Sequence, residues 1–488
     1  MKKIIWNFII ALSLTIVSCD DFLTIIPESE YSADGFYQTQ NDFGFAIAAV
    51  YAEQQGSYND ANSWIRAMIL RSDEAIGGDG YVKGFDRFTD GDDVGQLNGA
   101  WQRYWKIISR SNMIIERIDN VVFTDENLKN HIKGEAYILR GYAYWNLAWQ
   151  FGGVPIITKP LTVEETKAIP RSSQAETFAL AEEDLKNAHS LLPEEWTGAN
   201  IGRATKYAAA GTLARLLLFQ SKFTEAKPYL KEIIESGRFK MEEKYEDCFL
   251  DSKDNGPERV WDIQFTGGQL GEGTAFISGL LPEKIETDLM PFGGDAATVN
   301  VSNQFVAKYE PNDLRKDLSV RTDLIVGGLV DNTYRAIKFI RYDEYEPKAK
   351  NDWANNFCIL RYTDIKMMYA EVLNEEGYVA DGEAFKLINE VRARAGLNAL
   401  TSAEVPDQKS FREAIIHERE IEFAFEGLRW RDLVRWGIAK KVMDEFLKDP
   451  SEGSGIYHMD EFRTIFAIPA DEMTRYNNKD IMWQNPGY

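Results

Sequence analysis

The sequence has few of the residues that most catalytic and metal-binding sites use. It contains three cysteines and four histidines among 488 residues. No cysteine pair has metal-ligand spacing, and the segment from His417 to Glu420 lacks the second histidine of a zinc-protease motif. A nucleophile elbow and a phosphate-binding loop are also missing from the sequence. We therefore expect that the protein is not an enzyme.

Positive charge is also in short supply. Lysine and arginine number 55 against 77 acidic residues, and the formal net charge is −22. Nucleic-acid phosphates and anionic lipids both require a basic surface, so neither is an expected ligand. With 44% hydrophobic and 12% aromatic residues, the chain can fill a large core.

Long apolar runs are confined to the N-terminus. The stretch from Ile4 to Val17 is about 14 residues long, whereas a spanning helix needs about 20, so it fits a secretory signal. The segment from Ile16 to Cys19 resembles a bacterial lipobox, although an ordinary signal peptide with an incidental cysteine is the alternative. We expect a removed signal over residues 1–18, an acylated Cys19, and a lipidated tether over residues 19–40.

The two other cysteines are Cys248 and Cys358. An exported protein reaches an oxidising compartment in which disulfides persist. A disulfide between them and two isolated thiols are both compatible with the sequence.

Helical periodicity dominates the remaining chain. Apolar residues recur at three- and four-residue steps over residues 99–150, and further helices are predicted at 41–56, 174–192, 203–237, 363–395 and 409–448. Several form antiparallel pairs of tetratricopeptide type, which must stack on neighbours to bury their apolar faces. We predict a mostly α fold with two helical parts, residues 41–244 and 357–488. Between them, residues 245–356 predict an irregular, loop-rich insertion with a few short strands.

Five segments, in order, carry a resemblance to a known family. They are Arg140–Leu147 with Phe151–Pro155, Leu360–Ile365 with Met368–Glu371 and Asn374–Glu375, Ile388–Gly396, His417–Arg419 with Glu422–Gly427 and Arg429–Gly437, and Ile468–Ala470 with Gln484–Tyr488. Behind a lipobox, this series resembles the SusD/RagB family of starch-utilisation-type surface lipoproteins, and it covers most of the chain.

The resemblance implies a fold, a location and partners. Family members combine four tetratricopeptide-type helix pairs with a more variable, ligand-binding region. They are lipid-anchored on the outer face of the outer membrane, where they deliver a glycan to a SusC-like TonB-dependent transporter. Some members bind peptides instead. A helical glycoside hydrolase is a further alternative, because that chemistry needs only two suitably placed carboxylates.

Charged residues of the matching segments lie within apolar helical patterns. They are Arg140, Glu371, Arg419, Glu422 and Arg429. An unpaired buried charge is costly, so we expect these side chains to form structural ion pairs and not to contact the ligand.

Sugars offer apolar faces and many hydroxyls, so exposed aromatic rings flanked by polar groups are their expected binding partners. Trp101 and Trp105 lie on a regular helical face and are expected to be buried. Loop residues are better candidates, and the resemblance implies a site built from two areas. One precedes the helix at 99 and contains Asp73, Asp79, Tyr81, Asp86, Arg87 and Asn98. The other lies in the insertion and contains Phe276, Phe292, Asn300, Tyr334 and Trp353.

No cofactor is expected, but one acidic loop leaves calcium open. Asp86, Asp90, Asp92 and Asp93 place four carboxylates close together. Calcium binds six to eight oxygens from flexible loops, yet the spacing differs from that of an EF-hand. A solvated acidic loop is the favoured interpretation.

Overall fold

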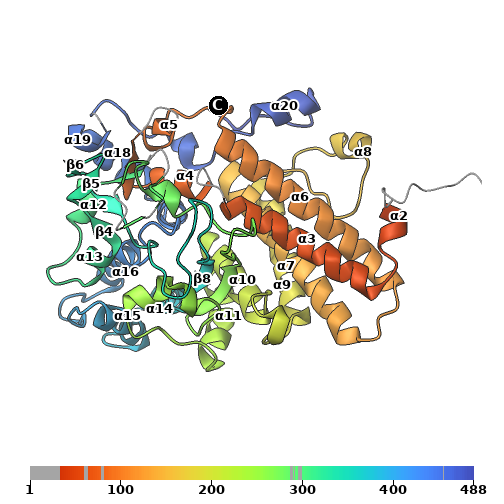
Figure 1. Ribbon diagram of the computed structural model, residues 1–488, viewed down its shortest axis with the longest axis horizontal. Helices are drawn as coiled ribbons and strands as arrows, with labels where there is room; N and C mark the ends of the chain where they lie inside the picture. The colour runs from red at the N-terminus through yellow and green to blue at the C-terminus, as the bar shows by residue number, and fades with distance from the viewer. Residues whose placement is uncertain are drawn as a thin grey trace, which may run out of the picture.

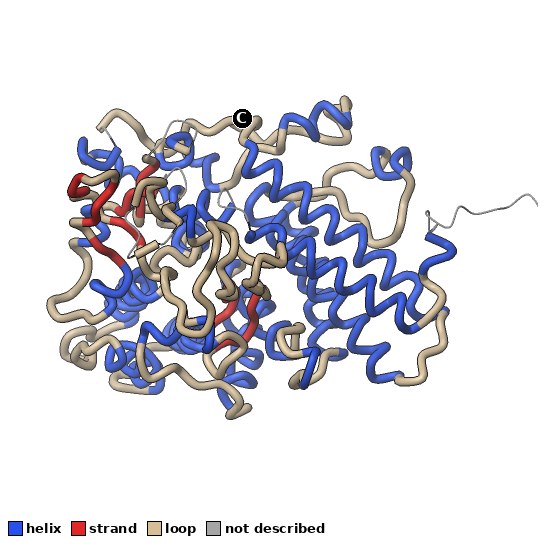
Figure 2. The backbone as a smooth tube through the Cα atoms, viewed as in Figure 1, coloured by secondary structure: helices blue, strands red, loops and turns tan. Residues whose placement is uncertain are grey.

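The computed structural model describes residues 33–59, 64–78, 82–285, 289–290, 292–294, 299–453 and 455–488. Within these residues the fold is mostly helical with a few short strands, as predicted (Figure 2). The expected signal segment and Cys19 lie outside the described residues. No helix that the structure describes has the length and apolar content needed to cross a membrane.

The N-terminal half is a stack of antiparallel helices (Figure 1). The long ones are α3 (Gln40–Asn59), α6 (Gly95–Arg117), α7 (Glu126–Phe151), α9 (Gln174–Leu191), α10 (Lys206–Phe219) and α11 (Phe223–Glu235). Shorter helices are α2 (Ala33–Phe36), α4 (Trp64–Leu70), α5 (Lys83–Asp86) and α8 (Val163–Lys167). Neighbours in sequence are neighbours in space, which is the arrangement expected of stacked helix pairs.

Helix α7 lies at the centre of this stack. Asp125 caps its first turn by accepting hydrogen bonds from the backbone amides of Asn127 and Leu128. Its second half is buried on every side, and it ends where Gly152 adopts a φ of 80°, a conformation that favours glycine. Helices α6 and α7 confirm the helical structure predicted over residues 99–150.

The insertion contains the strands that the sequence predicts only coarsely. Among the residues that the structure describes, four two-stranded antiparallel pairs form: β1 (Ala75–Gly77) with β3 (Val299–Val301), β2 (Arg259–Ile263) with β8 (Phe357–Arg361), β4 (Val320–Arg321) with β7 (Arg335–Ala336), and β5 (Leu324–Val326) with β6 (Leu329–Asp331). Two short helices, α12 (Asn303–Val306) and α13 (Arg315–Ser319), lie among them. Because β1 and β8 lie outside the insertion in sequence, the strands tie it to both helical halves.

The C-terminal half returns to helix pairs. It comprises α14 (Tyr362–Glu376), α15 (Glu383–Arg394), α16 (Gln408–Glu422), α17 (Arg429–Arg435), α18 (Ala439–Lys448), α19 (Pro450–Gly453) and α20 (Ala470–Tyr476). The tail then packs against the N-terminal half, where the Arg171 guanidinium donates to the carbonyls of Phe151 and Trp483 at 2.8 and 2.7 Å. Buried residues from both halves and the insertion form one hydrophobic cluster.

Buried ion pairs join the insertion to the C-terminal helices. The Glu422 carboxylate accepts from the guanidiniums of Arg315, Arg361 and Arg394 at 3.1, 2.9 and 2.6 Å. Burial alone would raise the pKa of Glu422, but these cations, Arg394 foremost, lower it to about 2. Glu422 is therefore charged at neutral pH, and its carboxylate pairs with these guanidiniums.

The other charged motif residues are paired in the same way. Arg140 binds Asp184 at 2.6 Å, Glu371 binds Arg435 at 2.6 Å, Arg419 binds Asp364 at 2.6 Å, and Arg429 binds Asp73 at 2.8 Å. All of these side chains are nearly or fully buried. The prediction that these residues are structural is confirmed.

Replacing Glu422 with glutamine should destabilise the protein by about 3–5 kcal/mol, because it leaves buried guanidiniums without their shared carboxylate. The measurement is urea unfolding of purified protein at pH 7. Glu413→Gln is the control, since that side chain is 67% exposed and should change stability by less than about 0.5 kcal/mol. Equal stabilities for the two variants would contradict a structural role for Glu422.

A second buried carboxylate, Glu74, predicts a pH dependence. It accepts hydrogen bonds from the Phe425 amide and the Ser72 hydroxyl, both at 3.1 Å. Burial, together with the neighbouring Asp73 charge, raises the pKa of Glu74 to about 8, so the folded protein holds a proton there that the unfolded chain releases above about pH 4.5. The free energy of unfolding should therefore fall as pH rises from about 4.5 to about 8.

Glu74→Gln removes this titration while keeping an acceptor for Phe425. Relative to the wild type, the variant should gain roughly 1–3 kcal/mol of stability between pH 5 and pH 8. Urea unfolding at both pH values measures the difference, in which the titration of other groups cancels. A stability difference that does not change with pH would show that Glu74 is ionised in the folded protein.

Candidate functional site

Strands β1 and β3 bring the two predicted binding areas together. They pair antiparallel, with Ile76 opposite Asn300. Two backbone hydrogen bonds extend the contact, from Ser302 to the Glu74 carbonyl and from Val301 to the Tyr334 carbonyl, both at 3.0 Å. Segments more than two hundred positions apart thus meet at one place, which we call the β1–β3 junction, comprising Ala75–Gly77, Val299–Val301 and the adjoining 331–335 segment.

A chain of polar side chains lies along this junction. The Arg335 guanidinium donates to the side-chain oxygen of Asn300 and, at 2.8 and 3.0 Å, to the Asp331 carboxylate. Partial burial would raise the pKa of Asp331, but hydrogen bonds from Thr333 and Arg335 lower it below its usual value. Asn300 and Tyr334 are half-buried, so each keeps some surface for a ligand.

Three further predicted residues are at least partly accessible. Phe292 is 36% exposed. Arg87 is half-buried, and its guanidinium lies 5.1 Å from the centre of the Tyr457 ring, within cation–π range. Asn98 is half-buried at the start of α6, where its amide donates to Asp471 at 2.9 Å. Asp79 and Tyr81 lie outside the described residues.

Four predicted site residues face the interior, which corrects the expectation that they are exposed. Asp73 is buried against Arg429 and Lys308, and the Asp86 carboxylate accepts from the Gly77 amide at 2.7 Å. The Phe276 ring packs at 5.4 Å from those of Phe339 and Phe357. Trp353 is 0% exposed, and its indole donates to the Ser278 hydroxyl at 3.0 Å. As the structure places them, none of the four presents a side chain to a ligand.

The acidic loop does not gather its carboxylates. Asp86 binds the Gly77 amide, Asp90 is buried in an ion pair with Arg71, and Asp92 and Asp93 are exposed. Among the residues that the structure describes, no group of three or more His, Cys, Asp or Glu is arranged to hold a metal ion. Cys248 and Cys358 are free thiols.

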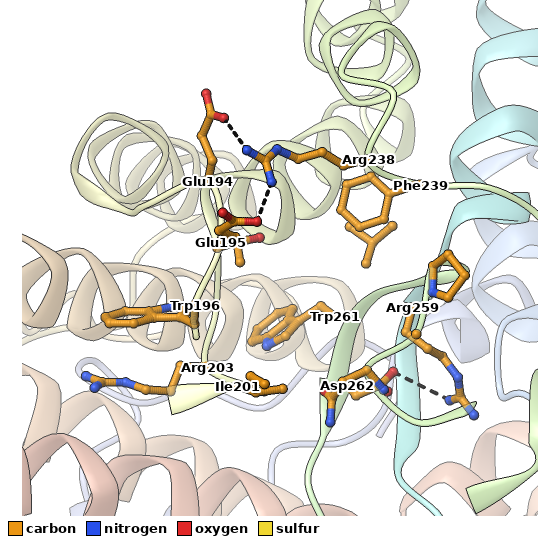
Figure 3. A pocket seen from close by; sticks show the side chains of 16 residues that line it. Glu194, Glu195, Trp196, Ile201, Arg203, Arg238, Phe239, Arg259, Trp261 and Asp262 are labelled. Atoms are coloured by element: carbon orange, nitrogen blue, oxygen red, sulfur yellow. Dashed lines mark hydrogen bonds and ion pairs between the residues drawn. The ribbon is translucent and has the colours of Figure 1, made fainter. Parts of the chain in front are cut away.

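One cavity, of about 440 Å³, opens between the N-terminal helices and strand β2. Figure 3 shows Trp196, Arg203 and Trp261 on one side of it, with Arg238 and Phe239 across from them. Its guanidiniums are already neutralised: Arg203 binds Glu135, Arg238 binds Glu195 at 2.6 Å, and Arg259 binds Asp254 at 3.1 Å. Sequence reasoning missed this cavity because its walls come from separate segments without a common motif.

Another cavity, of about 510 Å³, lies beside α6. Its lining includes Trp101, which is buried as predicted, and Trp105, which is partly exposed and not buried as expected. The helical pattern places both rings on the same stretch of α6. The position of α20 is not predictable from this pattern, and it forms a wall of the cavity that Trp105 lines.

Family models match both ends of the chain. One, described as the SusD family, matches residues 297–488, and another, described as starch-binding and associating with the outer membrane, matches residues 28–218. Among curated proteins, SusD-like protein P2 of Formosa agariphila is 27% identical over the full length of both chains. A SusD-like protein of Bacteroides ovatus is 25% identical over 87% of this chain and 81% of its own.

Solved structures share the fold. Surface glycan-binding protein A from Bacteroides fluxus superposes with a TM-score of 0.81 at 24% identity, covering 92% of this chain and all of its own. A laminarin-binding SusD-like protein gives 0.78 at 22% identity over 93% of this chain and all of its own. Surface glycan-binding protein A from Bacteroides thetaiotaomicron, in complex with laminarihexaose, gives 0.78 at 21% identity over 92% of this chain and all of its own. The family models, the full-length relative and the shared architecture show that this chain belongs to the SusD/RagB family.

Proposed function

We propose that this protein captures an oligosaccharide or polysaccharide at the cell surface and delivers it to a SusC-like TonB-dependent transporter. As a SusD-type protein it is a binding protein and not an enzyme. The β1–β3 junction is the observation that supports the site, because it joins segments from the two areas that the family resemblance implies. Solved SusD-like proteins named for laminarin or bound to laminarihexaose support the ligand class.

The junction has the two kinds of group that a sugar requires. Half-buried Tyr334 supplies aromatic surface for the apolar face of a pyranose ring. The amide of Asn300 and the carboxylate of Asp331, both held by Arg335, supply hydrogen-bonding capacity for hydroxyls. Because the Arg335 guanidinium fixes both groups before binding, little side-chain entropy is lost when the ligand arrives.

Calorimetry against a polysaccharide and oligosaccharide panel that includes laminarihexaose should identify a ligand. Tyr81→Ala and Tyr334→Ala should each weaken its binding about tenfold, the loss expected for one aromatic stacking partner. Phe45→Ala is the matched control, since this exposed ring lies on α3, away from the junction, and its loss should leave affinity unchanged.

Two results would contradict this site or ligand class. If a glycan binds and neither Tyr81→Ala nor Tyr334→Ala weakens it, the site lies elsewhere. If peptides bind and no glycan in the panel does, the ligand class is wrong, and the protein is a peptide-binding member of its family.

The proposed location depends on acylation of Cys19 at the outer membrane, facing the exterior. In membranes of a bacterium expressing the wild type, the protein should fractionate with the outer membrane and co-purify a large barrel protein after detergent extraction. Cys19→Ala should leave the membrane fraction, because it lacks the acyl chains that hold the protein there. Membrane retention of Cys19→Ala would contradict the anchor, and recovery of no barrel with the wild type would contradict the transporter partnership.

A further inference from the structure

The cavity beside α6 is built by three segments that are far apart in sequence. Its walls are α6, the stretch 157–161 that leads to α8, and α20 near the C-terminus. Figure 1 shows α20 and α8 flanking α6. Helix α20 is held across α6 by the Asn98–Asp471 hydrogen bond and by the Ala470 amide, which donates to the Asp92 carbonyl at 2.8 Å. The cavity of about 510 Å³ is large enough for a sugar unit.

Its lining carries a surplus of positive charge. Lys106, Lys159 and Arg475 face a single lining carboxylate, Glu472. Arg475 contacts Glu472 at 3.4 Å, whereas Lys106 and Lys159 are exposed and make no ion pair among the described residues. The cavity of Figure 3 differs, because each guanidinium in its lining has a carboxylate partner. In a chain with a net charge of −22, two unpaired ammonium groups at one concave site favour an anionic ligand.

Aromatic surface adjoins these cations. Trp105 is partly exposed, and its ring is fixed by edge contacts with Trp101 and Tyr144 at 5.9 and 6.2 Å. Tyr476 lines the same cavity, and burial raises the pKa of its phenol to about 12. The phenol therefore stays protonated and able to donate. A rigid indole beside ammonium groups suits a ligand with both an apolar ring face and a negative charge.

We propose that this cavity is a second binding site, which takes an acidic sugar unit of a glycan. The carboxylate or sulfate of the sugar contacts Lys106 and Lys159, and the ring packs on Trp105. This inference rests on the proposed glycan-binding function but concerns a site separate from the β1–β3 junction. It specifies a ligand whose anionic units are held at α6.

The test uses charged and neutral oligosaccharides of matched backbone. Wild-type protein is titrated calorimetrically with tetragalacturonate and its methyl ester, and with sulfated and unmodified laminarihexaose. At least one anionic oligosaccharide should bind at least tenfold more tightly than its neutral counterpart, and its affinity should fall as salt is raised. Binding of the uronate or the sulfated probe alone identifies which anionic group the cavity accepts.

Variants locate the binding. The double variant Lys106→Gln/Lys159→Gln should lose that preference for charge, because each lost charge-assisted contact weakens binding. Lys231→Gln/Lys409→Gln is the control, since it removes the same net charge from exposed positions on α11 and α16 and should retain the preference. All four lysines are outside the core, so both double variants should fold.

Three results would overturn the inference: equal affinity for charged and neutral probes, no binding of either anionic probe at millimolar concentration, or equal losses in the two double variants. Neutral-glycan binding at the junction is measured separately through Tyr334→Ala. Failure of the acidic-sugar site is therefore distinguishable from failure of the proposed function.

Discussion

The structure depends on the mutual neutralisation of buried charge. Glu422 on α16 collects guanidiniums from α13, β8 and α15, so one carboxylate joins the insertion to the C-terminal helices. Arg361 extends this cluster to Glu258 and Glu426, and Lys338 reaches Glu426 at 2.7 Å. Removing any one partner leaves another charge buried without compensation, so the segments are required to meet in one arrangement.

A neighbouring cluster carries this constraint to the candidate site. Asp73 binds Arg429 on α17 and Lys308 beyond α12, and these cations hold the pKa of Asp73 far below its usual value despite its burial. Asp73 and Glu74 immediately precede β1, and the Glu74 carbonyl accepts from Ser302 just after β3. Ion pairs in the core thus fix both strands of the junction. Asp73, which the sequence predicts as a ligand contact, serves instead to position the β1–β3 junction.

How much of the structure the sequence predicts depends on whether the residues that form each pattern lie close together in the sequence. The periodicity of α7 and its stop at Gly152 involve near neighbours in sequence, so both are predictable. The pairing of Arg140 and of Glu422 is predictable as well, because burying a charge without a partner costs more free energy than burying it in an ion pair. Trp353 and Phe276 were not predictable: the insertion has no regular period, so an aromatic residue that forms its local core has the same sequence context as one exposed to solvent.

The two cavities and the β1–β3 junction differ in whether their charged groups already have partners within the protein. In the cavity of Figure 3 each guanidinium is neutralised within the protein, so no group there demands a charged ligand. At the β1–β3 junction, Arg335 satisfies Asp331 and Asn300 while leaving them partly accessible, which suits neutral hydroxyls.

Beside α6, Lys106 and Lys159 form no ion pair among the described residues, which suits an anion. The sequence predicts Asn98 as a ligand contact. In the structure its amide donates a hydrogen bond to Asp471 on α20, and α20 forms a wall of this second cavity. The start of α6 therefore holds α20, and with it a wall of this cavity, in place. A glycan that carries both neutral and acidic units has complementary surfaces at the two sites.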